Sequence, residues 1–434
     1  MSEGQTKIDV IYGIDDKPKL KNAIPLAFQH ILAMFAANIT VPIMVATLLN
    51  FSPQETTFII QCSLLMAGVT TFIQIRKGRL IGSGLPIVMG TSNAFIATVM
   101  AIAGDFGIGA VLGASFIGGL FEILLGKNLN RLKKIFTPLI SGIVVLTIGI
   151  TLIPVGIKQA AGGSSDMGNP KSLLIAAIVL ITIILFNQSR NKFLKSSSIL
   201  IGIVFGYIIS YFTGMVNFSS VSDAGWLSFP KPLTYKWSFP PAAIIAMLFM
   251  YIATAIETMG DISALTIGAE GREATDQELS GGVIADGLSS SLAAIFNGFP
   301  NTSYTQNIGV VNLTGVFSRY VVKIGAIILL VLSIFPKFSA IIAVIPTPVL
   351  GGAAIAMFSM VAVSGLALIQ EIKLDSRNML IIAISLGVGV GFNIVPEATK
   401  QLPQNMQFFL TSGVVPSALV GILMNLFLPK SVSK

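Results

Sequence analysis

The chain has 434 residues, of which 53% are hydrophobic and only 11% are charged, and its mean hydropathy is +0.85. A soluble domain carries about 25% charged residues, so composition excludes a soluble globular class, and apolar runs that are continuous rather than alternating exclude a β-barrel. The net charge of +8 is interpreted as a membrane-orientation signal rather than a nucleic-acid signal, and the single cysteine, Cys62, excludes an internal disulfide and a cysteine-based metal site.

A spanning helix needs about 20 apolar residues, and runs of this kind recur along the first half of the chain. Met1–Lys21 mixes Lys with Asp and has no apolar signal-peptide region, so the first run is expected to be a retained helix. Gly84, Pro86 and Gly90 interrupt the third run. The first seven spans are predicted at Asn22–Leu49, Glu55–Ile75, Gly84–Ala103, Gly107–Leu125, Ile135–Leu152, Leu173–Phe186 and Ser197–Phe212.

The second half begins after a polar loop, Asn217–Ser238, that contains both tryptophans. The segment Gly298–Thr314 is crowded with amides, hydroxyls, Gly and Pro, yet apolar runs flank it. A membrane tolerates such a segment only where it is buried in protein or lines a wet cavity. The second seven spans are predicted at Pro240–Ile267, Leu279–Phe296, Gly298–Thr314, Val321–Phe335, Pro346–Leu368, Asn378–Phe392 and Gln404–Leu428.

Placing the N-terminus in the cytoplasm satisfies the positive-inside rule, by which cytoplasmic loops carry the excess of Lys and Arg. Omitting any one span would scramble this asymmetry, so both termini are expected in the cytoplasm. Most of the 27 basic residues then lie inside, and those left outside are Lys158, Lys171, Lys231, Lys236, Lys337 and Lys400.

Two motifs occur twice, at nearly equal spacing. Gly84-Leu-Pro86 returns as Gly298-Phe-Pro300, and Thr137-Pro-Leu-Ile-Ser-Gly142 returns as Thr347-Pro-Val-Leu-Gly-Gly352. A repeat of seven spans, an odd number, must be inverted in the membrane. Paired Gly/Pro-interrupted spans in two such halves indicate a transporter binding site between them.

Ionisable side chains inside spans are costly and functional by default. Glu257 and Asp261 share one helix face through their i, i+4 spacing. We interpret Glu257 as a carboxylate that exchanges a proton and accepts hydrogen bonds from a planar heterocycle. Asp261 and Asp286 are either proton-coupling residues or helix-to-helix latches, and His30 either touches substrate or orients a neighbour. Glu122, near the end of the fourth span, is interpreted as a carboxylate that reaches the aqueous boundary.

The segment Gly298–Thr314 adds amides to these acids. Gln306 and Asn307 each offer two donors and an acceptor, so the pair can read the edge of a purine or pyrimidine. Asn93 corresponds to Asn307 at the spacing of the Gly-x-Pro repeat, and helices that begin near both would direct backbone N–H groups into a cavity. Two aromatic residues nearby are either ring-stacking or packing residues, Phe95 and Tyr304.

With these residues, the chain resembles the nucleobase–ascorbate transporter family from Gln29-His30 to its last span. The family signature, Gln/Glu-Asn-x-Gly-(x)4-Thr, reads here Gln306-Asn307-Ile308-Gly309-Val-Val-Asn-Leu-Thr314. A Glu-x-x-Gly-Asp motif begins at Glu257, and an Ala-Asp-Gly motif surrounds Asp286.

The resemblance implies an all-α polytopic membrane protein with fourteen spans in two inverted seven-helix repeats, and short β-strands in spans 3 and 10. A cytoplasmic tail, 1–21, would precede a core domain built from 22–126 and 239–336. The gate domain would comprise 127–238 and 337–434, including the C-terminal tail. The family commonly dimerises and moves its core against its gate in an elevator-like stroke.

The resemblance also assigns roles by position. Glu257 aligns with the carboxylate that binds the nucleobase, and Gln306 with the substrate-reading residue of the signature. Uracil carriers of the family have Glu at the Gln306 position and His where Asp261 stands, so this chain looks like the xanthine/uric acid branch. Ile308 departs from the Asn often seen there, which leaves the particular purine open. Positions linked to affinity, substrate choice or proton coupling are His30, Asn93, Asp261, Asp286 and Asn307.

The sequence thus predicts proton-coupled uptake of an oxidised purine, xanthine or uric acid, across the cytoplasmic membrane, and no enzyme activity. No cofactor or metal is expected, and Na⁺ is not excluded as the coupling ion. The expected partners are the purine, the bilayer and a second copy of the chain, and no nucleic acid. A uracil or other nucleobase symporter is the alternative. An anion exchanger or channel would need a positive site, whereas Glu257, Asp261 and Asp286 make this one acidic.

Overall fold

The computed structural model describes residues 10–78, 80–129, 137–163, 166–191, 194–195, 197–370 and 372–429. Several basic residues predicted on the cytoplasmic side lie outside this part, as does the predicted start of the fifth span, 135–136. These basic residues are Lys7, Arg79, Arg131, Lys133, Lys134, Lys192, Lys430 and Lys434.

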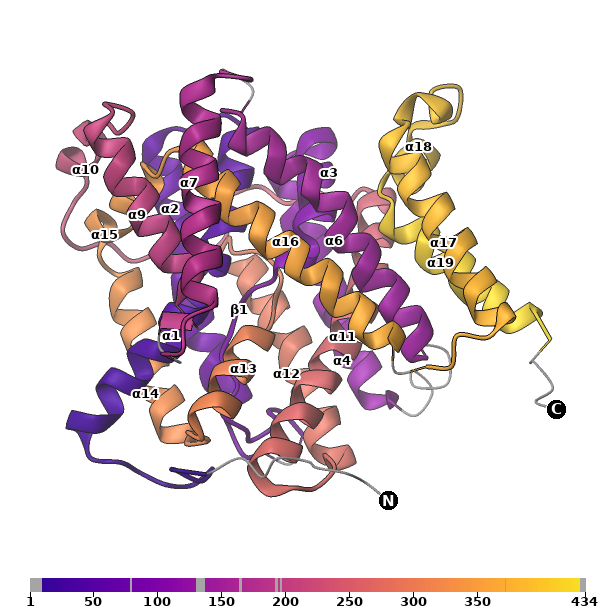
Figure 1. Cartoon of the computed structure of the whole chain (residues 1–434), viewed down its shortest axis with the longest axis horizontal. Coiled ribbons are helices and arrows are strands. Elements are labelled where there is room, and N and C mark those ends of the chain that lie inside the picture. Colours follow the sequence, from indigo (N-terminus) through magenta and orange to yellow (C-terminus); the bar gives the residue numbers. More distant parts are fainter. Residues whose placement is uncertain are drawn as a thin grey trace.

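Helices dominate the fold, and Figure 1 shows their arrangement. The first half contains α1 (Leu20–Leu48), α2 (Pro53–Gln74), α3 (Ile96–Phe106), α4 (Ile108–Lys127), α6 (Pro138–Ala160), α7 (Pro170–Asn187), α9 (Ser198–Phe212) and the short α10 (Ser219–Asp223). The second half contains α11 (Pro241–Glu270), α12 (Asp276–Ile295), α13 (Thr305–Thr314), α14 (Arg319–Ser333), α15 (Pro336–Ala343), α16 (Thr347–Gln370), α17 (Ser376–Ile394), α18 (Gln404–Thr411) and α19 (Val414–Phe427).

Among the described residues, 8 helices are long and apolar enough to cross a membrane, or 9 if the bent pair α14–α15 counts as one span. Three shorter apolar helices cover Asn93–Phe106, Ser198–Phe212 and Val414–Phe427. The many apolar helices fit the polytopic helical class that composition predicts. The count of fourteen and the inverted repeat stay predictions.

Apart from the two interrupted spans, three predicted spans differ most from the observed helices. The last span is divided, because Gly413 between α18 and α19 has a left-handed φ of 72° that glycine adopts without strain. The chain bends by 85° between α14 and α15, where Pro336 begins a new helix that the sequence did not predict. The fifth span was predicted to end at Leu152, but α6 continues through Pro154 to Ala160.

Glycines let two helix pairs approach closely. A Cβ atom on Gly287 of α12 would lie 2.4 Å from the carbonyl oxygen of Gly119 on α4, so only glycine fits this crossing. On α6, a Cβ on Gly149 would lie 2.3 Å from the backbone nitrogen of Ala362 on α16. The helices α6 and α16 begin at the two Thr-Pro motifs and run side by side in opposite directions (Figure 1).

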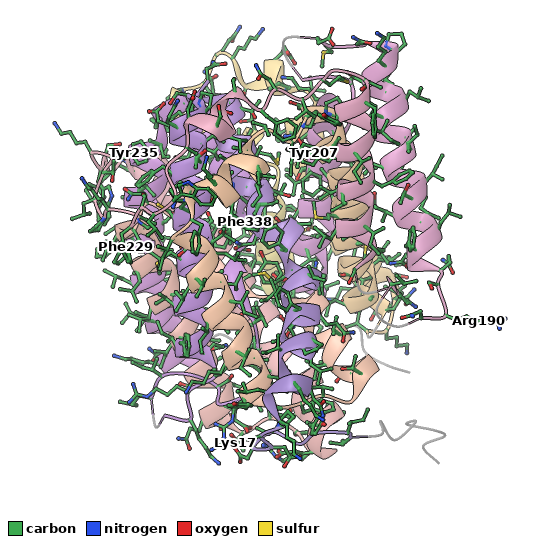
Figure 2. The ribbon with its side chains drawn as sticks, turned by 90° about the vertical axis from the view of Figure 1, so that its left-hand side faces the viewer. Lys17, Arg190, Tyr207, Phe229, Tyr235 and Phe338 are labelled. Atoms are coloured by element: carbon green, nitrogen blue, oxygen red, sulfur yellow. The ribbon has the colours of Figure 1, made fainter. Side chains whose placement is uncertain are left out.

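The helices form two packed groups. One contains α1, α2, α4, α11, α12 and α14, and the other contains α6, α7, α9, α16, α17 and α19. In Figure 1, α17, α18 and α19 stand at the side opposite α1 and α14. Figure 2 shows apolar side chains around the middle of the molecule, with Lys17 and Tyr235 towards opposite ends.

Two short strands lie inside the first group. The strands β1 (Met89–Thr91) and β2 (Asn301–Ser303) pair antiparallel, with Gly90 opposite Thr302. Each strand leads into a helical segment, β1 into a 3₁₀ turn at Asn93–Phe95 and β2 into α13. The strands expected in the two interrupted spans are therefore present and in contact.

The N-terminal segment before α1 is bound to the turn between α13 and α14. The backbone nitrogen of Phe317 donates to the carbonyl of Tyr12 (2.8 Å), and that of Arg319 donates to Ile14 (3.0 Å). Arg319 also forms an ion pair with Asp15. The segment is thus attached to the end of the helix that carries the signature.

Candidate functional site

A cavity opens beside the ends of β1 and β2. It is bounded by α11 on one side and by α6 and α16 on the other, so both packed groups contribute to it. Four of the predicted substrate-binding residues line it, namely Asn93, Glu257, Tyr304 and Gln306. The remaining lining residues are Ser92, Ala94, Val145, Ile148, Thr302, Ser303 and Val361.

Side chains from neighbouring helices hold both strands in place. The hydroxyl of Ser290 on α12 donates to the carbonyl of Asn301 and accepts from its backbone nitrogen, each at 3.0 Å. On the other strand, the backbone nitrogen of Met89 donates to Thr71 Oγ1 (2.9 Å), and that of Thr91 donates to Asn38 Oδ1 (2.8 Å). Fixed strands place the cavity-lining residues that follow them.

Tyr304 lies across β1 at the start of α13. Its hydroxyl donates to the carbonyl of Thr91 (2.5 Å), and its backbone nitrogen donates to the carbonyl of Val88 (3.1 Å). A Cβ atom on Gly90 would lie 2.8 Å from the Tyr304 ring, so glycine at this position makes room for it. The ring is therefore fixed at the cavity wall.

Hydroxyls of the β2 region hold Asp261. Ser303 Oγ donates to Asp261 Oδ2 (2.5 Å), and Thr305 Oγ1 donates to Asp261 Oδ1 (2.9 Å). The side chain is buried on α11, one helical turn after Glu257. Both oxygens have partners, as a buried carboxylate requires.

Asp286 on α12 contacts the same strand from the other side. Its Oδ2 accepts from Thr302 Oγ1 (3.1 Å) and from Thr258 Oγ1 at short range. Its Oδ1 has no hydrogen-bond partner in the described part of the chain. The two aspartates therefore flank β2, and neither is among the residues that line the cavity.

Glu257 and Gln306 present polar groups to the cavity. Both side chains are half-buried, and Gln306 forms no hydrogen bond with another described residue. Asn93 Oδ1 likewise has no partner within the described ranges. A carboxylate and two amides facing one cavity can meet the alternating donors and acceptors of a planar heterocycle.

Two predicted substrate residues lie behind the cavity wall. Asn307 is buried, and its Nδ2 lies 2.7 Å from His30 Nδ1 on α1. Phe95 is fully buried, and its ring packs against that of Tyr251 with centroids 4.7 Å apart. His30 thus contacts the signature amide, and the Phe95 ring packs against another aromatic ring.

The structure contradicts the interpretation of Glu122 as a carboxylate at the aqueous boundary. Its side chain is completely buried between α4, α11 and α12, and Thr254 Oγ1 donates to its Oε1 (3.3 Å). The close glycine crossing of Gly119 and Gly287 brings α12 over it, because a Cβ on Gly287 would lie 3.0 Å from Glu122 Cβ. Two buried carboxyls, Glu122 and Asp286, therefore share this helix interface.

Sequence reasoning missed the hydroxyls of the site and its apolar wall. The hydroxyls are those of Thr258, Thr302, Ser303 and Thr305, which bind the two aspartates. The wall residues come from the two helices that begin with the Thr-Pro repeat, and this repeat was the available signal. They are Val145, Ile148 and Val361.

The fold of this chain is similar to that of two solved structures. The transmembrane domain of a cyanobacterial bicarbonate transporter, BicA, superposes with a TM-score of 0.59 at 15% identity, covering 95% of this chain and 100% of that one. The structure of SLC26A9 gives a TM-score of 0.62 at 13% identity, covering 94% and 66%. At such low identity the likeness concerns the fold alone.

Comparisons with characterised sequences are much closer. The chain is 37% identical to the xanthine permease of Bacillus subtilis over 407 residues, 93% of each chain. It is 36% identical to the xanthine permease XanP of Escherichia coli (97% and 95% covered) and 36% identical to the nucleobase transporter PlUacP of Paenibacillus larvae (93% of each). A family model described as "Permease family", Xan_ur_permease, matches residues 21–398. This chain therefore belongs to that permease family, the nucleobase–ascorbate transporters, which are membrane transport proteins and not enzymes.

Proposed function

We propose that this protein imports an oxidised purine, xanthine or uric acid, across the cytoplasmic membrane together with a proton. The observation that carries the proposal is the cavity into which Glu257 of α11 and Gln306 of α13 both project. The carboxylate accepts hydrogen bonds from ring N–H groups, and the amide both donates and accepts. Relatives of 36–37% identity are named xanthine permeases, which supports the same substrate class here.

The transport step in this proposal is a movement of one packed group past the other. The group that carries the substrate residues would be the core, 22–126 and 239–336, and the group with α6 and α16 the gate, 127–238 and 337–434. Val145, Ile148 and Val361 give the gate an apolar face towards the cavity. Only a core whose acids are neutralised by substrate and proton would cross this face, because an unpaired buried charge is costly. Both termini would lie in the cytoplasm, and the chain would form a homodimer.

Two rival substrates follow from the same fold. A uracil carrier is disfavoured by Gln306, and an anion exchanger is disfavoured by an acidic site. The deciding experiment is uptake of radiolabelled xanthine, urate, uracil and bicarbonate by cells that express the protein, with and without a proton uncoupler and with Na⁺ replaced. We expect xanthine or urate uptake that the uncoupler abolishes. Uptake that depends on Na⁺ and not on the proton gradient would show that Na⁺ is the coupling ion. A preference for uracil or bicarbonate as substrate would overturn the proposal.

A further inference from the structure

A chain of hydroxyls joins the two aspartates that flank β2. Thr258 Oγ1 on α11 contacts Asp286 Oδ2 on α12 and lies 3.3 Å from Ser303 Oγ. Ser303 Oγ in turn donates to Asp261 Oδ2 at 2.5 Å. Within the described residues, Thr258 is the side chain that contacts both Asp286 and Ser303, so it closes the path between the acids.

Thr258 has one proton to donate and more than one acceptor within reach. A threonine hydroxyl is a single donor with two lone pairs. Its neighbours are Asp286 Oδ2, Ser303 Oγ and Thr302 Oγ1, the last at 3.2 Å. When Asp286 is ionised, the Thr258 hydroxyl donates its hydrogen bond to that carboxylate. When Asp286 carries a proton, its own O–H can donate to Thr258, and the Thr258 O–H is free to turn to Ser303.

We propose that Thr258 relays a proton between Asp286 and Asp261, and so acts as a positioning residue for proton coupling. The proposal rests on the proposed proton-coupled function. In the step, the proton of Asp286 moves to Thr258 Oγ1 and the original hydroxyl proton of Thr258 moves to Ser303 Oγ. The original hydroxyl proton of Ser303 then moves to Asp261 Oδ2. Both hydroxyls end neutral, and the proton lost by Asp286 equals the proton gained by Asp261.

The surroundings restrict where this proton can go. The titratable groups that face the path are Asp286 from α12, Glu122 from α4, and Asp261 and Glu257 from α11 itself. The nearby phenol of Tyr304 already donates to the carbonyl of Thr91. The Tyr251 hydroxyl similarly donates to the backbone carbonyl of Ser115, and His30 contacts Asn307 behind the cavity wall. Asp261 lies one helical turn after Glu257, which lines the cavity, so Asp261 is taken as the substrate end of the path.

The test compares Thr258→Val, which has a similar shape but no hydroxyl, with Thr258→Ser, which keeps it. The matched control is Thr266→Val. Thr266 is also buried on α11, but among the described residues its hydroxyl donates only to the carbonyl of Ser263 in its own helix (3.0 Å). Each purified protein is reconstituted in liposomes, and two quantities are measured. One is xanthine accumulation driven by an imposed pH gradient, as a function of external pH. The other is xanthine exchange at equal pH on both sides, which requires no net proton transfer.

We expect Thr258→Val to reduce gradient-driven accumulation at least about tenfold, the effect of losing a hydrogen bond to a charged group, and to flatten its pH profile. Exchange should stay near the wild-type rate, and Thr258→Ser and Thr266→Val should behave as wild type. Wild-type accumulation by Thr258→Val overturns the relay. Parallel loss of accumulation and exchange also overturns it, because that is a structural defect. A wild type that exchanges xanthine but ignores the pH gradient overturns proton coupling itself, and the relay with it.

Discussion

His30 Nδ1 on α1 lies 2.7 Å from Asn307 Nδ2 on α13, so the histidine meets the signature through an amide and not through the cavity. Asn307 immediately follows Gln306, which lines the cavity. A side chain from another helix therefore contacts the residue next to Gln306.

Replacing His30 should weaken substrate binding rather than abolish transport. We expect His30→Ala to raise the KM for xanthine up to about tenfold, the range of one neutral hydrogen bond, with little change in the maximal rate. His30→Gln keeps an acceptor and should lie between. Initial uptake rates over a range of xanthine concentrations measure both quantities. A loss of maximal rate at unchanged KM would contradict an orienting role.

Glu257→Gln should abolish xanthine and urate uptake. In the proposed mechanism a proton neutralises the Glu257 carboxylate, and an amide has neither an ionisable proton nor a negative charge. The protein should still reach the membrane, since Gln has nearly the same shape. Uptake is measured beside immunoblots of isolated membranes. Glu273→Gln is the control, because Glu273 is exposed in the loop before α12. Wild-type uptake by Glu257→Gln would remove this residue from the mechanism.

Gln306→Glu tests whether the amide reads the purine. The carboxylate offers no donor in its ionised form and would add a second negative charge beside Glu257. We expect xanthine uptake to fall at least about tenfold, while competition by uracil becomes stronger relative to xanthine. The exposed Gln401→Glu serves as a control for added charge. An unchanged order of competing nucleobases would show that Gln306 does not set specificity.

The glycine crossing of α4 and α12 should be intolerant of even one methyl group. In Gly287→Ala, the new Cβ would lie 2.4 Å from the Gly119 carbonyl, so the helices must move apart. We expect a loss of about 1–3 kcal/mol, as for overpacked cores, seen as a lower Tm in detergent. Gly391→Ala on α17 meets no atom within 4 Å and should leave the Tm unchanged. Equal Tm values for both variants would contradict the prediction that the α4–α12 crossing has no room for a methyl group.

Hydropathy predicted most helices within a few residues, for example Ser197–Phe212 against the observed Ser198–Phe212. It could not predict the break at Gly413 or the bend at Pro336, because apolar composition continues across both. A glycine or proline in an apolar run can break a helix or remain inside it, as Pro154 does in α6. Packing around each residue decides which occurs.

The acids and amides of the site were predictable because such groups are rare in spans. The hydroxyls were not, since many Ser and Thr side chains in the helices bond to the backbone of their own helix, as Thr266 does, and only packing shows that Thr258 reaches another helix. Glu122 was misplaced for a related reason. Its position near a helix end suggested water, whereas the glycines of two distant segments close the helix interface over it.

The attachment of the N-terminal segment to the turn after α13 makes it a reporter of motion. A fluorophore on Val10→Cys, next to the backbone bond from Ile11 to Gly315 (2.8 Å), would travel with the signature helix. A second label on Met379→Cys, exposed on α17, would stay with the other helix group. Cys62 is the only native cysteine and is buried, so the labels can be directed to the two new sites. The distance between them, followed as xanthine is added, would measure the proposed movement of one helix group past the other.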